Sequence, residues 1–218
     1  MAPATDVVWD CACGTGQASV GLAKHFARVV ATDASAEQIA HAEAQSGVEY
    51  RVAAAEDSGL ADESVSLVTV AQALHWFDVD AFHREVQRVL RPGGVIAEWS
   101  YALLEVPDAP AVADAVDALD AQLRDWWPPQ RRHVDARYTT LAFPFTPIEL
   151  GSFDMTAAWS AAALIGYVST WSAVSRYRAA NDDDPIPAFA AAVEQAWGHA
   201  STHAVYWPLT LRAGRMPA

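Results

Sequence analysis

The chain has 218 residues, of which 52% are hydrophobic and 19% are charged, a composition typical of a globular protein with one sizeable core. Its 14 Lys and Arg against 27 Asp and Glu leave a net charge of −13, which repels nucleic-acid phosphates and anionic lipid, so we expect no nucleic acid and no membrane among its partners. The sequence starts without a basic segment and no apolar run reaches transmembrane length, so we expect neither signal peptide nor spanning helix, and a cytoplasmic location.

The first hundred residues alternate between short apolar runs and helix-forming segments. In chain order they predict a strand at 7–9, a helix at 18–27, a strand at 27–33, a helix at 35–45, strands at 50–53 and 65–71, a helix at 81–90 and a strand at 94–100. Strands that alternate with helices pair in parallel, because each crossover returns the chain to the same end of the sheet. We therefore predict an α/β fold with a Rossmann-like, mostly parallel sheet and helices on both faces.

The second half of the chain has a different pattern. Residues 105–150 are rich in Pro, Trp and Arg and predict a helical insertion after the fifth strand, with a helix at 110–125. The remaining elements that we predict are a strand at 147–155, one or two helices over 157–180 and a closing strand at 204–214, the strands forming an antiparallel pair. We expect a single domain, 1–218, in which 1–104 binds a cofactor, 105–150 caps the substrate and 151–218 supplies the C-terminal strands and helices.

The stretch VVWDCACGTGQAS (7–19) places a carboxylate and a Gly-x-Gly turn directly after the first strand. A dinucleotide fingerprint needs a third small residue at the end of the turn, and this run lacks its last glycine. Asp10 would repel a pyrophosphate and attract a cation, so the turn suits a zwitterionic amino-acid tail better than a diphosphate.

The two cysteines, Cys11 and Cys13, stand in the same turn. They are too close in sequence for an unstrained disulfide, and no nearby Cys or His completes a tetrahedral metal site. We expect reduced, packed side chains and no metal.

Acids also follow the second and third predicted strands. Asp33 can accept hydrogen bonds from both ribose hydroxyls, and Glu56 stands where an adenine edge would lie. Because the carboxyl ends of parallel strands meet at one edge of a sheet, these acids converge with residues 72–75 on one crevice. The set predicts a ligand made of a nucleoside with an amino-acid tail and no phosphate.

In combination these motifs resemble the class I S-adenosylmethionine-dependent methyltransferases, in particular the branch of trans-aconitate methyltransferase and its small-molecule (methyltransferase type 11) relatives. The segments that carry the resemblance are DCACGTGQAS (10–19), ATDAS (31–35), AAAED (53–57), VTVAQALHWFD (68–78), EVQRVLRPGGVIAEWSY (85–101) and GYVSTWSAVSRY (166–177). The resemblance covers nearly the whole chain. It implies S-adenosyl-L-methionine as cofactor and methyl transfer to an O (or N or S) atom of a small molecule, with a carboxylate as one candidate.

The resemblance also implies a role for each matching position. The implied cofactor contacts are Asp10, Ala12, Gly14, Thr15, Gly16 and Gln17 around the methionine tail, Asp33 at the ribose, Ala34, Ala55 and Glu56 at the adenine and Gln72 near the sulfonium. Family members often have Gly where this chain has Ala12, so we expect the tail to be held slightly further off. Two alternatives remain open: Asp33 as a helix N-cap, although Ser35 is better placed, and Glu56 as a solvated loop acid.

The acceptor side is predicted from a histidine and aromatic side chains. His75 would act as a base for a hydroxyl acceptor or as a cation that orients a carboxylate; the alternative is a histidine that only hydrogen-bonds its loop. Trp76, Tyr138 and Trp171 are the predicted substrate-binding residues, because apolar walls with a few cations suit a small organic acid or an aromatic compound. Plain packing is the alternative for each of them.

Family members carry a few dozen residues before the first strand, and six precede Val7 here. We therefore expect the helices that close over the cofactor to be missing, either because the sequence is truncated or because the site is open. Two rival functions remain: a non-catalytic S-adenosylmethionine-binding protein, and an NAD(P)-dependent oxidoreductase, which Asp10 and the incomplete fingerprint disfavour. A monomer and a homodimer are both compatible with the sequence.

Overall fold

The computed structural model describes residue 2 and residues 4–216 and divides the chain into two compact units. The first unit contains the chain up to Tyr101, His133–Ser152 and the chain from Thr210 onward. The second unit contains Ala102–Arg132 and Phe153–Leu209. The predicted insertion, 105–150, contributes residues to both units.

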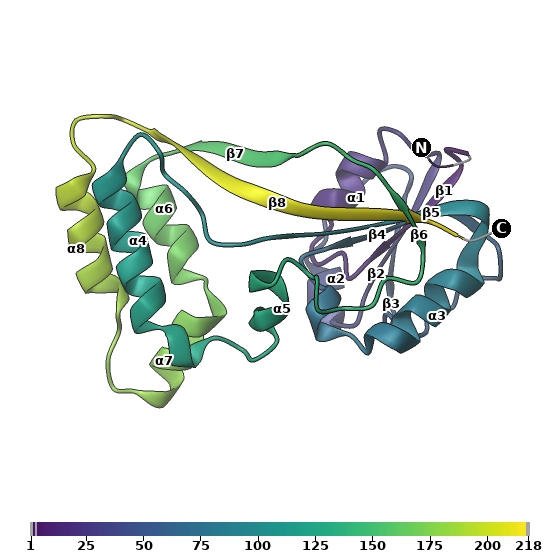
Figure 1. The fold of residues 1–218 in the computed structure, drawn as a ribbon, viewed down its shortest axis with the longest axis horizontal. Helices are drawn as coiled ribbons and strands as arrows, with labels where there is room; N and C mark the ends of the chain where they lie inside the picture. The colour runs from purple at the N-terminus through teal and green to yellow at the C-terminus, as the bar shows by residue number, and fades with distance from the viewer. Residues whose placement is uncertain (1, 3, 217–218) are drawn as a thin grey trace. The chain divides into compact units, whose positions relative to one another are not determined.

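The first unit is built on a sheet with the strand order β3-β2-β1-β4-β5-β8-β6 (Figure 1). Its elements are β1 (Val7–Cys11), α1 (Gln17–Leu22), β2 (Arg28–Asp33), α2 (Ala36–Ala40), β3 (Val48–Val52), β4 (Val65–Ala71), the 3₁₀ helix η1 (Leu74–Trp76), α3 (Val79–Val89), β5 (Leu90–Tyr101) and β6 (Thr146–Ile148). The short helix α5 (Arg131–Asp135) lies where the chain enters this unit from the second one. The first five strands pair in parallel and β8 (His203–Arg215) pairs with β6 in antiparallel fashion. This order confirms the predicted Rossmann-like α/β fold with an antiparallel C-terminal pair.

The alternation of side chains along β1 explains why helices cover both faces of this sheet. Trp9 and Cys11 belong to one buried cluster, which includes Phe82 and Val86 of α3. Val8 belongs to a second cluster, against which side chains of α1 and α2 pack. Successive strand residues point to opposite faces, so a strand that is apolar throughout needs a cover on each side.

The second unit combines four helices with a strand pair. The helices are α4 (Pro110–Gln122), α6 (Ala161–Ser169), α7 (Ser172–Ala180) and α8 (Ile186–Ala196), with the 3₁₀ helix η2 (Arg124–Trp126) after α4. The strand β7 (Asp154–Trp159) pairs antiparallel with the first half of β8, from Asp154 opposite Pro208 to Trp159 opposite His203. The long strand β8 therefore begins in the second unit and ends in the first (Figure 1).

Several predicted boundaries differ from the structure for local reasons. The predicted helix 81–90 begins at Val79, because the Asp78 carboxylate caps it by accepting a hydrogen bond from the Ala81 N–H. The predicted strand 147–155 is two strands, β6 and β7. Helix α8 was not predicted; Pro187 lies in its first turn, where the backbone N–H has no helical acceptor and proline loses no hydrogen bond.

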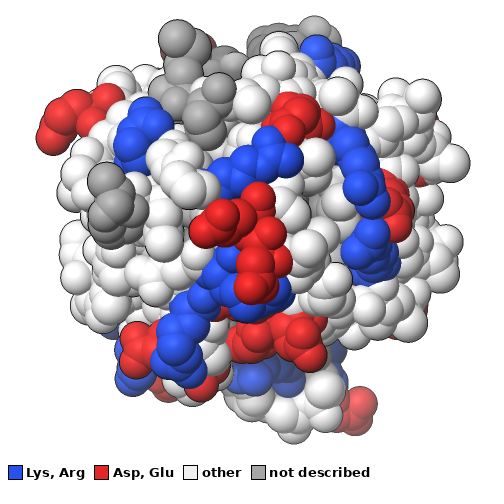
Figure 2. Space-filling model, turned by 90° about the vertical axis from the view of Figure 1, so that its right-hand side faces the viewer, with Lys and Arg blue, Asp and Glu red and all other residues white. Residues whose placement is uncertain are grey.

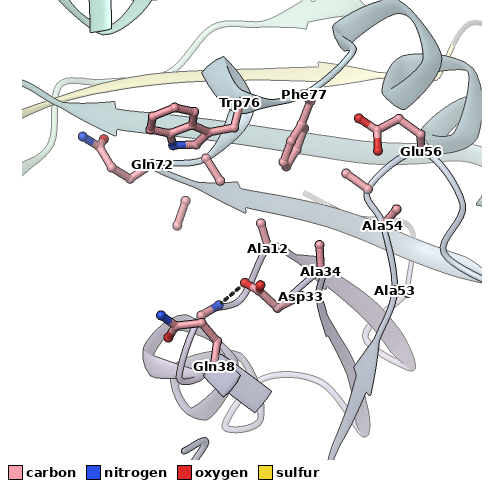
Figure 3. Close-up of a pocket in the computed structure, with 14 residues that line it drawn as sticks. Ala12, Asp33, Ala34, Gln38, Ala53, Ala54, Glu56, Gln72, Trp76 and Phe77 are labelled. Atoms are coloured by element: carbon pink, nitrogen blue, oxygen red, sulfur yellow. Dashed lines mark hydrogen bonds between the residues drawn. The ribbon is translucent and has the colours of Figure 1, made fainter. Parts of the chain in front are cut away.

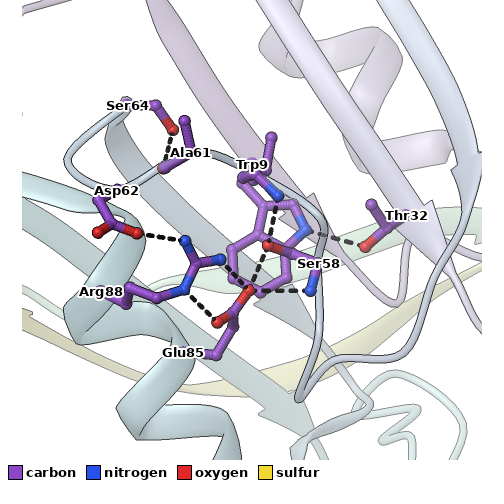
Figure 4. A network of polar contacts seen from close by, with 9 residues as sticks. Trp9, Thr32, Ser58, Ala61, Asp62, Ser64, Glu85 and Arg88 are labelled. Carbon is purple, nitrogen blue, oxygen red and sulfur yellow. Dashed lines mark hydrogen bonds and ion pairs between the residues drawn. The ribbon is translucent and has the colours of Figure 1, made fainter.

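A buried polar network fixes the loop that follows β3. The Ser58 backbone N–H and hydroxyl both donate to Glu85 Oε1 on α3, at 2.9 and 2.5 Å (Figure 4). Arg88 donates to both oxygens of Glu85 and to the carboxylate of Asp62 on the far side (Figure 4). One carboxylate thus joins α3 to the loop whose first residues, Ala53 to Glu56, line the cavity described below.

Charged side chains of both signs alternate on the face of the first unit shown in Figure 2. Ion pairs between neighbouring segments, such as Arg28 with Glu49 and Arg88 with Asp62, bring opposite charges together and leave the net charge unchanged. Exposed pairs of this kind contribute little to stability, about 0.2–1 kcal/mol each. Across the described part of the chain, no helix is both long enough and apolar enough to cross a membrane.

Candidate functional site

A cavity of about 500 Å³ opens at the carboxyl ends of β1, β2, β3 and β4 in the first unit (Figure 3). Its wall is formed by Ala12, Gly14, Asp33, Ala34, Gln38, Ala53, Ala54, Ala55, Glu56, Ala71, Gln72, Ala73, Trp76 and Phe77. Eight of the predicted site residues are among these: Ala12, Gly14, Asp33, Ala34, Ala55, Glu56, Gln72 and Trp76. The strand order therefore brings together residues that are far apart in the sequence.

The glycine turn after β1 has a backbone that only small residues adopt easily. Gly14 and Gly16 have φ of 57° and 93°, in the left-handed region. A Cβ on Gly16 would lie 2.2 Å from the Tyr50 hydroxyl oxygen, so no side chain fits there. The Gly16 N–H donates to the Cys13 carbonyl at 2.9 Å, which closes the turn.

Asp33 holds this turn from the end of β2 while facing the cavity. Its Oδ2 accepts from the Gly14 N–H at 2.9 Å (Figure 3). Its Oδ1 accepts from the Ser35 N–H, also at 2.9 Å. Each carboxylate oxygen has two acceptor sites, so both retain capacity for a ligand hydroxyl. The cap of α2 is Ser35, whose hydroxyl accepts from the Gln38 N–H, and Asp33 is therefore not the N-cap.

Two cavity residues other than glycine have strained backbones. Ala12 and Gln72 have φ of 53° and 52°, a conformation that costs an L-residue roughly 1–2 kcal/mol. The Gln72 side chain donates from Nε2 to the Tyr101 carbonyl at 3.0 Å and accepts from the Tyr101 N–H at 2.8 Å. This pair of bonds holds the end of β4 to the end of β5. Strain of this kind is tolerated where the surrounding contacts impose it, as at functional sites.

Small side chains and one carboxylate form the far wall of the cavity. Ala34, Ala53, Ala54 and Ala55 leave space that larger residues would fill. Glu56 faces this space and accepts from the Asp78 N–H at 3.0 Å, so it joins the loop after β3 to the start of α3 (Figure 3). Such a slot accommodates a flat ring with hydrogen-bonding groups on its edge.

Asp10 lies behind the turn and not in the cavity wall. Its side chain is 1% exposed, and its two oxygens accept from the hydroxyls of Ser19 at 2.5 Å and Thr69 at 2.8 Å. Burial raises the pKa of this carboxyl, and the two hydroxyl bonds oppose the rise. Thr15, Gly16 and Gln17 are also absent from the wall, so the contacts of these four residues with a cofactor tail remain predictions.

His75 stands at the edge of the cavity, on η1 next to Trp76. Its Nδ1 lies 3.2 Å from the hydroxyl oxygen of Tyr138, a fully buried side chain. Burial, with a smaller effect of His133, lowers the pKa of His75 to about 4, so the imidazole is neutral at pH 7. Trp76 is 55% exposed and lines the cavity, whereas His75 and Tyr138 do not.

Trp171 belongs to the second unit, where it lies at the start of α7. Its ring packs on Trp127 with centroids 5.4 Å apart, and Trp127 donates to Asp120 and lies under the guanidinium of Arg131. This aromatic cluster belongs to the second unit alone. The predicted part of Trp171 in substrate binding stays a prediction.

The cavity also contains residues that the sequence analysis did not assign. These are Gln38, Ala53, Ala54, Ala71 and Ala73, and Phe77 beside Trp76 completes the wall. Gln38 could have been found from the predicted helix 35–45, since it follows Asp33 by little more than one helical turn. Alanines carry no chemical signal in a sequence and could not have been singled out.

Residues 9–97, in the first half of the chain, match the family model of a methyltransferase domain. A Dictyostelium discoideum protein assigned by name to the methyltransferases is 35% identical over 187 residues, 84% of this chain and 70% of its own length. A Saccharomyces cerevisiae protein named as an S-adenosylmethionine-dependent methyltransferase is 31% identical over 109 residues, 46% of this chain and 38% of its own.

A solved structure from Anaeromyxobacter dehalogenans, named as a type II methyltransferase, superposes with a TM-score of 0.90 at 44% identity, covering 99% of this chain and 92% of its own. The position of the cavity at the strand ends, the acids that border it and these similarities agree with one another. The chain belongs to the class I S-adenosylmethionine-dependent methyltransferases.

Proposed function

We propose that this protein transfers a methyl group to an oxygen atom of a small molecule, with the adenosyl part of its cofactor in the cavity of the first unit. The observation that carries the proposal is the carboxylate of Asp33, which borders an alanine-lined space and keeps acceptor capacity on both oxygens. A ribose needs such an acceptor, and an adenine needs a flat apolar slot.

The charges around the cavity fit this cofactor better than a dinucleotide. Asp33 and Glu56 line the wall, and Asp10 lies behind the turn. Negative groups favour a sulfonium nucleoside with an ammonium group over a diphosphate. Family membership argues in the same direction against the oxidoreductase alternative.

When bound, S-adenosyl-L-methionine supplies an electrophilic methyl group on its sulfonium. The residues of the chain then have to orient the nucleoside and exclude water, and alignment of this kind contributes up to about 7–11 kcal/mol to rate enhancement. Asp33 would hold the ribose, the alanines would pack on the base, and Gln72 would keep the ends of β4 and β5 together beside the reacting atoms.

His75 is proposed as a neutral hydrogen-bond donor to the methyl acceptor. Burial raises the pKa of Tyr138, so the phenol stays protonated. In this proposal the Tyr138 O–H donates to His75 Nδ1, 3.2 Å away, and the imidazole keeps its proton on Nε2.

A donor at Nε2 suits an acceptor that already carries a nucleophilic oxygen. A carboxylate needs no base, whereas an alcohol or phenol has to lose a proton during transfer. The neutral state removes the cationic role that the sequence analysis considered for His75. With Nδ1 occupied by Tyr138, the imidazole has no free acceptor nitrogen to serve as the base that a hydroxyl acceptor needs, which favours a carboxylate, and the sequence resemblance to the trans-aconitate methyltransferase branch supports the same choice.

The test compares binding with turnover in two variants. Calorimetry with S-adenosylhomocysteine is expected to show binding weakened about tenfold or more by Asp33→Ala, because two ribose hydrogen bonds are lost. His75→Ala is expected to leave that affinity unchanged and to lower methyl transfer from labelled cofactor to a panel of small carboxylic acids. Asp117→Asn, at an exposed acid of α4, is the control for charge.

Each result has a distinct reading. Equal heats from wild type and Asp33→Ala would contradict the ribose assignment. Binding by the wild type without transfer to any carboxylic, phenolic, amine or thiol acceptor would favour the non-catalytic alternative. Transfer by His75→Ala at the wild-type rate would remove His75 from the reaction.

A further inference from the structure

Tyr50 has a buried hydroxyl that no neighbouring group satisfies. Among the described residues, its oxygen is one of three buried side-chain polar atoms without a hydrogen-bond partner. Leaving such a group unpaired costs free energy, so native proteins rarely do so without a functional reason. The proposed function assigns no role to this residue.

The Tyr50 hydroxyl lies against the glycine turn, on the side where a Gly16 side chain would stand. Tyr50 lies on β3 opposite Ala31 of β2, and its ring packs in the cluster that contains Cys13 and Val29. The oxygen lies 2.2 Å from the point where a Cβ on Gly16 would stand, so the missing side chain of Gly16 makes room for the phenol. The turn that the hydroxyl touches continues through Gly14 into the cavity wall.

The state of this hydroxyl makes it a donor. Burial raises the pKa of Tyr50, and the neighbouring Cys13 and Asp10 raise it further, so the phenol is protonated at every physiological pH. Among the described residues that line the cavity, none is Lys or Arg. The amino-acid tail carries an ammonium group and a carboxylate. The nearby negative charges of Asp10 and Asp33 suit the ammonium group. The carboxylate has only neutral donors at this turn to bind it.

We propose that the Tyr50 hydroxyl donates a hydrogen bond to the carboxylate of the cofactor's amino-acid tail at the Gly14–Gly16 turn. This inference rests on the proposed function, since it assumes that the nucleoside occupies the cavity with its tail at the turn. Tyr50 is thereby a specificity residue for the tail and takes no part in binding the nucleoside.

The experiment separates the tail from the nucleoside by using two ligands. S-adenosylhomocysteine carries the amino-acid tail, and 5′-methylthioadenosine has the same nucleoside without it. Tyr50→Phe keeps the ring and removes only the O–H. By calorimetry we expect the variant to bind S-adenosylhomocysteine about tenfold more weakly, as for a lost bond to a charged group, and to bind methylthioadenosine as the wild type does.

Thermal unfolding without ligand is a second measurement, in which Tyr50→Phe is expected not to weaken the protein although it weakens ligand binding. Because the variant loses an unpaired buried hydroxyl, its ligand-free midpoint is expected to equal or exceed that of the wild type, while saturating S-adenosylhomocysteine raises it less. Tyr177→Phe is the matched control, because its hydroxyl donates to Asp183, at 3.0 Å, at an exposed position of the second unit.

The outcomes separate this inference from the function beneath it. Equal weakening of both ligands by Tyr50→Phe would show that the ring only positions the turn, and unchanged binding of both would show that the hydroxyl has no part; either result overturns the proposal. Failure of the wild type to bind either ligand would contradict the proposed function itself.

Discussion

Ala12, in the turn after β1, has a backbone conformation that glycine would adopt more easily. Ala12 has a φ of 53°, where its methyl group is crowded against the backbone. Glycine would adopt the same conformation without strain, although it has more freedom to lose on folding. The alanine therefore gives up stability beside the cavity, and its methyl group narrows the space in front of the turn.

Replacing this alanine with glycine is expected to stabilise the protein. For Ala12→Gly we expect a gain of about 0.5–1 kcal/mol in the free energy of unfolding, since the relieved strain exceeds the added entropy of the unfolded chain. Urea unfolding with an unchanged slope measures it. The control, Ala118→Gly on the exposed side of α4, should lose about 1 kcal/mol, because glycine is a poor helix former. A lower free energy of unfolding in both variants would contradict the claim that Ala12 is strained.

The sequence predicted residues where chemistry follows from position in the chain. Asp33 and Glu56 each follow a strand, and parallel strands bring their ends together, so the convergence on one cavity needed no coordinates. Tyr50 could not be found this way. It sits inside a strand, where a tyrosine reads as packing, and only the empty Cβ position of Gly16 shows that its hydroxyl reaches the turn.

At the scale of elements, a few side chains hold the loops that shape the cavity. Glu85 of α3 takes both the N–H and the hydroxyl of Ser58, and through them it fixes the loop from Ala53 to Ser58. Burial raises the pKa of Glu85, but hydrogen bonds from Arg88 and Ser58 lower it by more, so the net shift is downward. The folded protein therefore favours the ionised form of Glu85 over the protonated form more than the unfolded chain does.

The Glu85 network is expected to make stability depend on pH at acid values. A lowered folded-state pKa stabilises the protein fully above the ordinary value of 4.5, and this contribution is lost as the pH falls through the folded-state pKa. Glu85→Gln should cost about 1–3 kcal/mol at pH 7, because Gln leaves donors of Ser58 or Arg88 unpaired. The same variant should lose less stability than the wild type on acidification.

Denaturant unfolding at pH 7 and at pH 4 measures both effects. Asp62→Asn is the control within the same network, since the Asp62 side chain is 77% exposed and its pair with Arg88 should contribute no more than about 0.5 kcal/mol. An equal cost for the two variants would contradict the view that the buried carboxylate, and not the surface pair, holds the loop.

Element boundaries were harder to predict than the elements themselves, for reasons that differ along the chain. The strands β1, β2, β4 and β5 contain apolar runs, because both faces of the sheet are covered there, whereas the edge strand β3 carries Glu49 and Arg51. The antiparallel pairing with β8 was predicted, but the division of the predicted strand 147–155 into β6 and β7, which both pair with β8, was not. The predicted helix 81–90 ends at Val89, whereas the strand predicted at 94–100 begins at Leu90 and runs through RPGG (91–94).

At the scale of the whole molecule, the chain is divided so that one unit contains the complete cavity. Every residue of the cavity wall belongs to the first unit. The second unit has its own core, in which Leu164, Val168, Phe189 and Val193 are buried on α6 and α8. Ligand binding and the packing of α6 and α8 are therefore carried by separate sets of side chains.

This division predicts where S-adenosylhomocysteine slows backbone hydrogen exchange. A ligand at one hundred times its Kd stabilises the native state by about 2.7 kcal/mol, and local opening of the segments it contacts is suppressed most. We expect protection in peptides that cover 12–17, 33–38, 53–56 and 71–77, and none beyond the global effect in 186–196, the helix α8. Exchange measured by mass spectrometry with and without the ligand, in the wild type and in Asp33→Ala at the same concentration, tests this pattern. Protection of α8 as strong as that of the turn would mean that the nucleoside is bound by side chains outside the cavity wall.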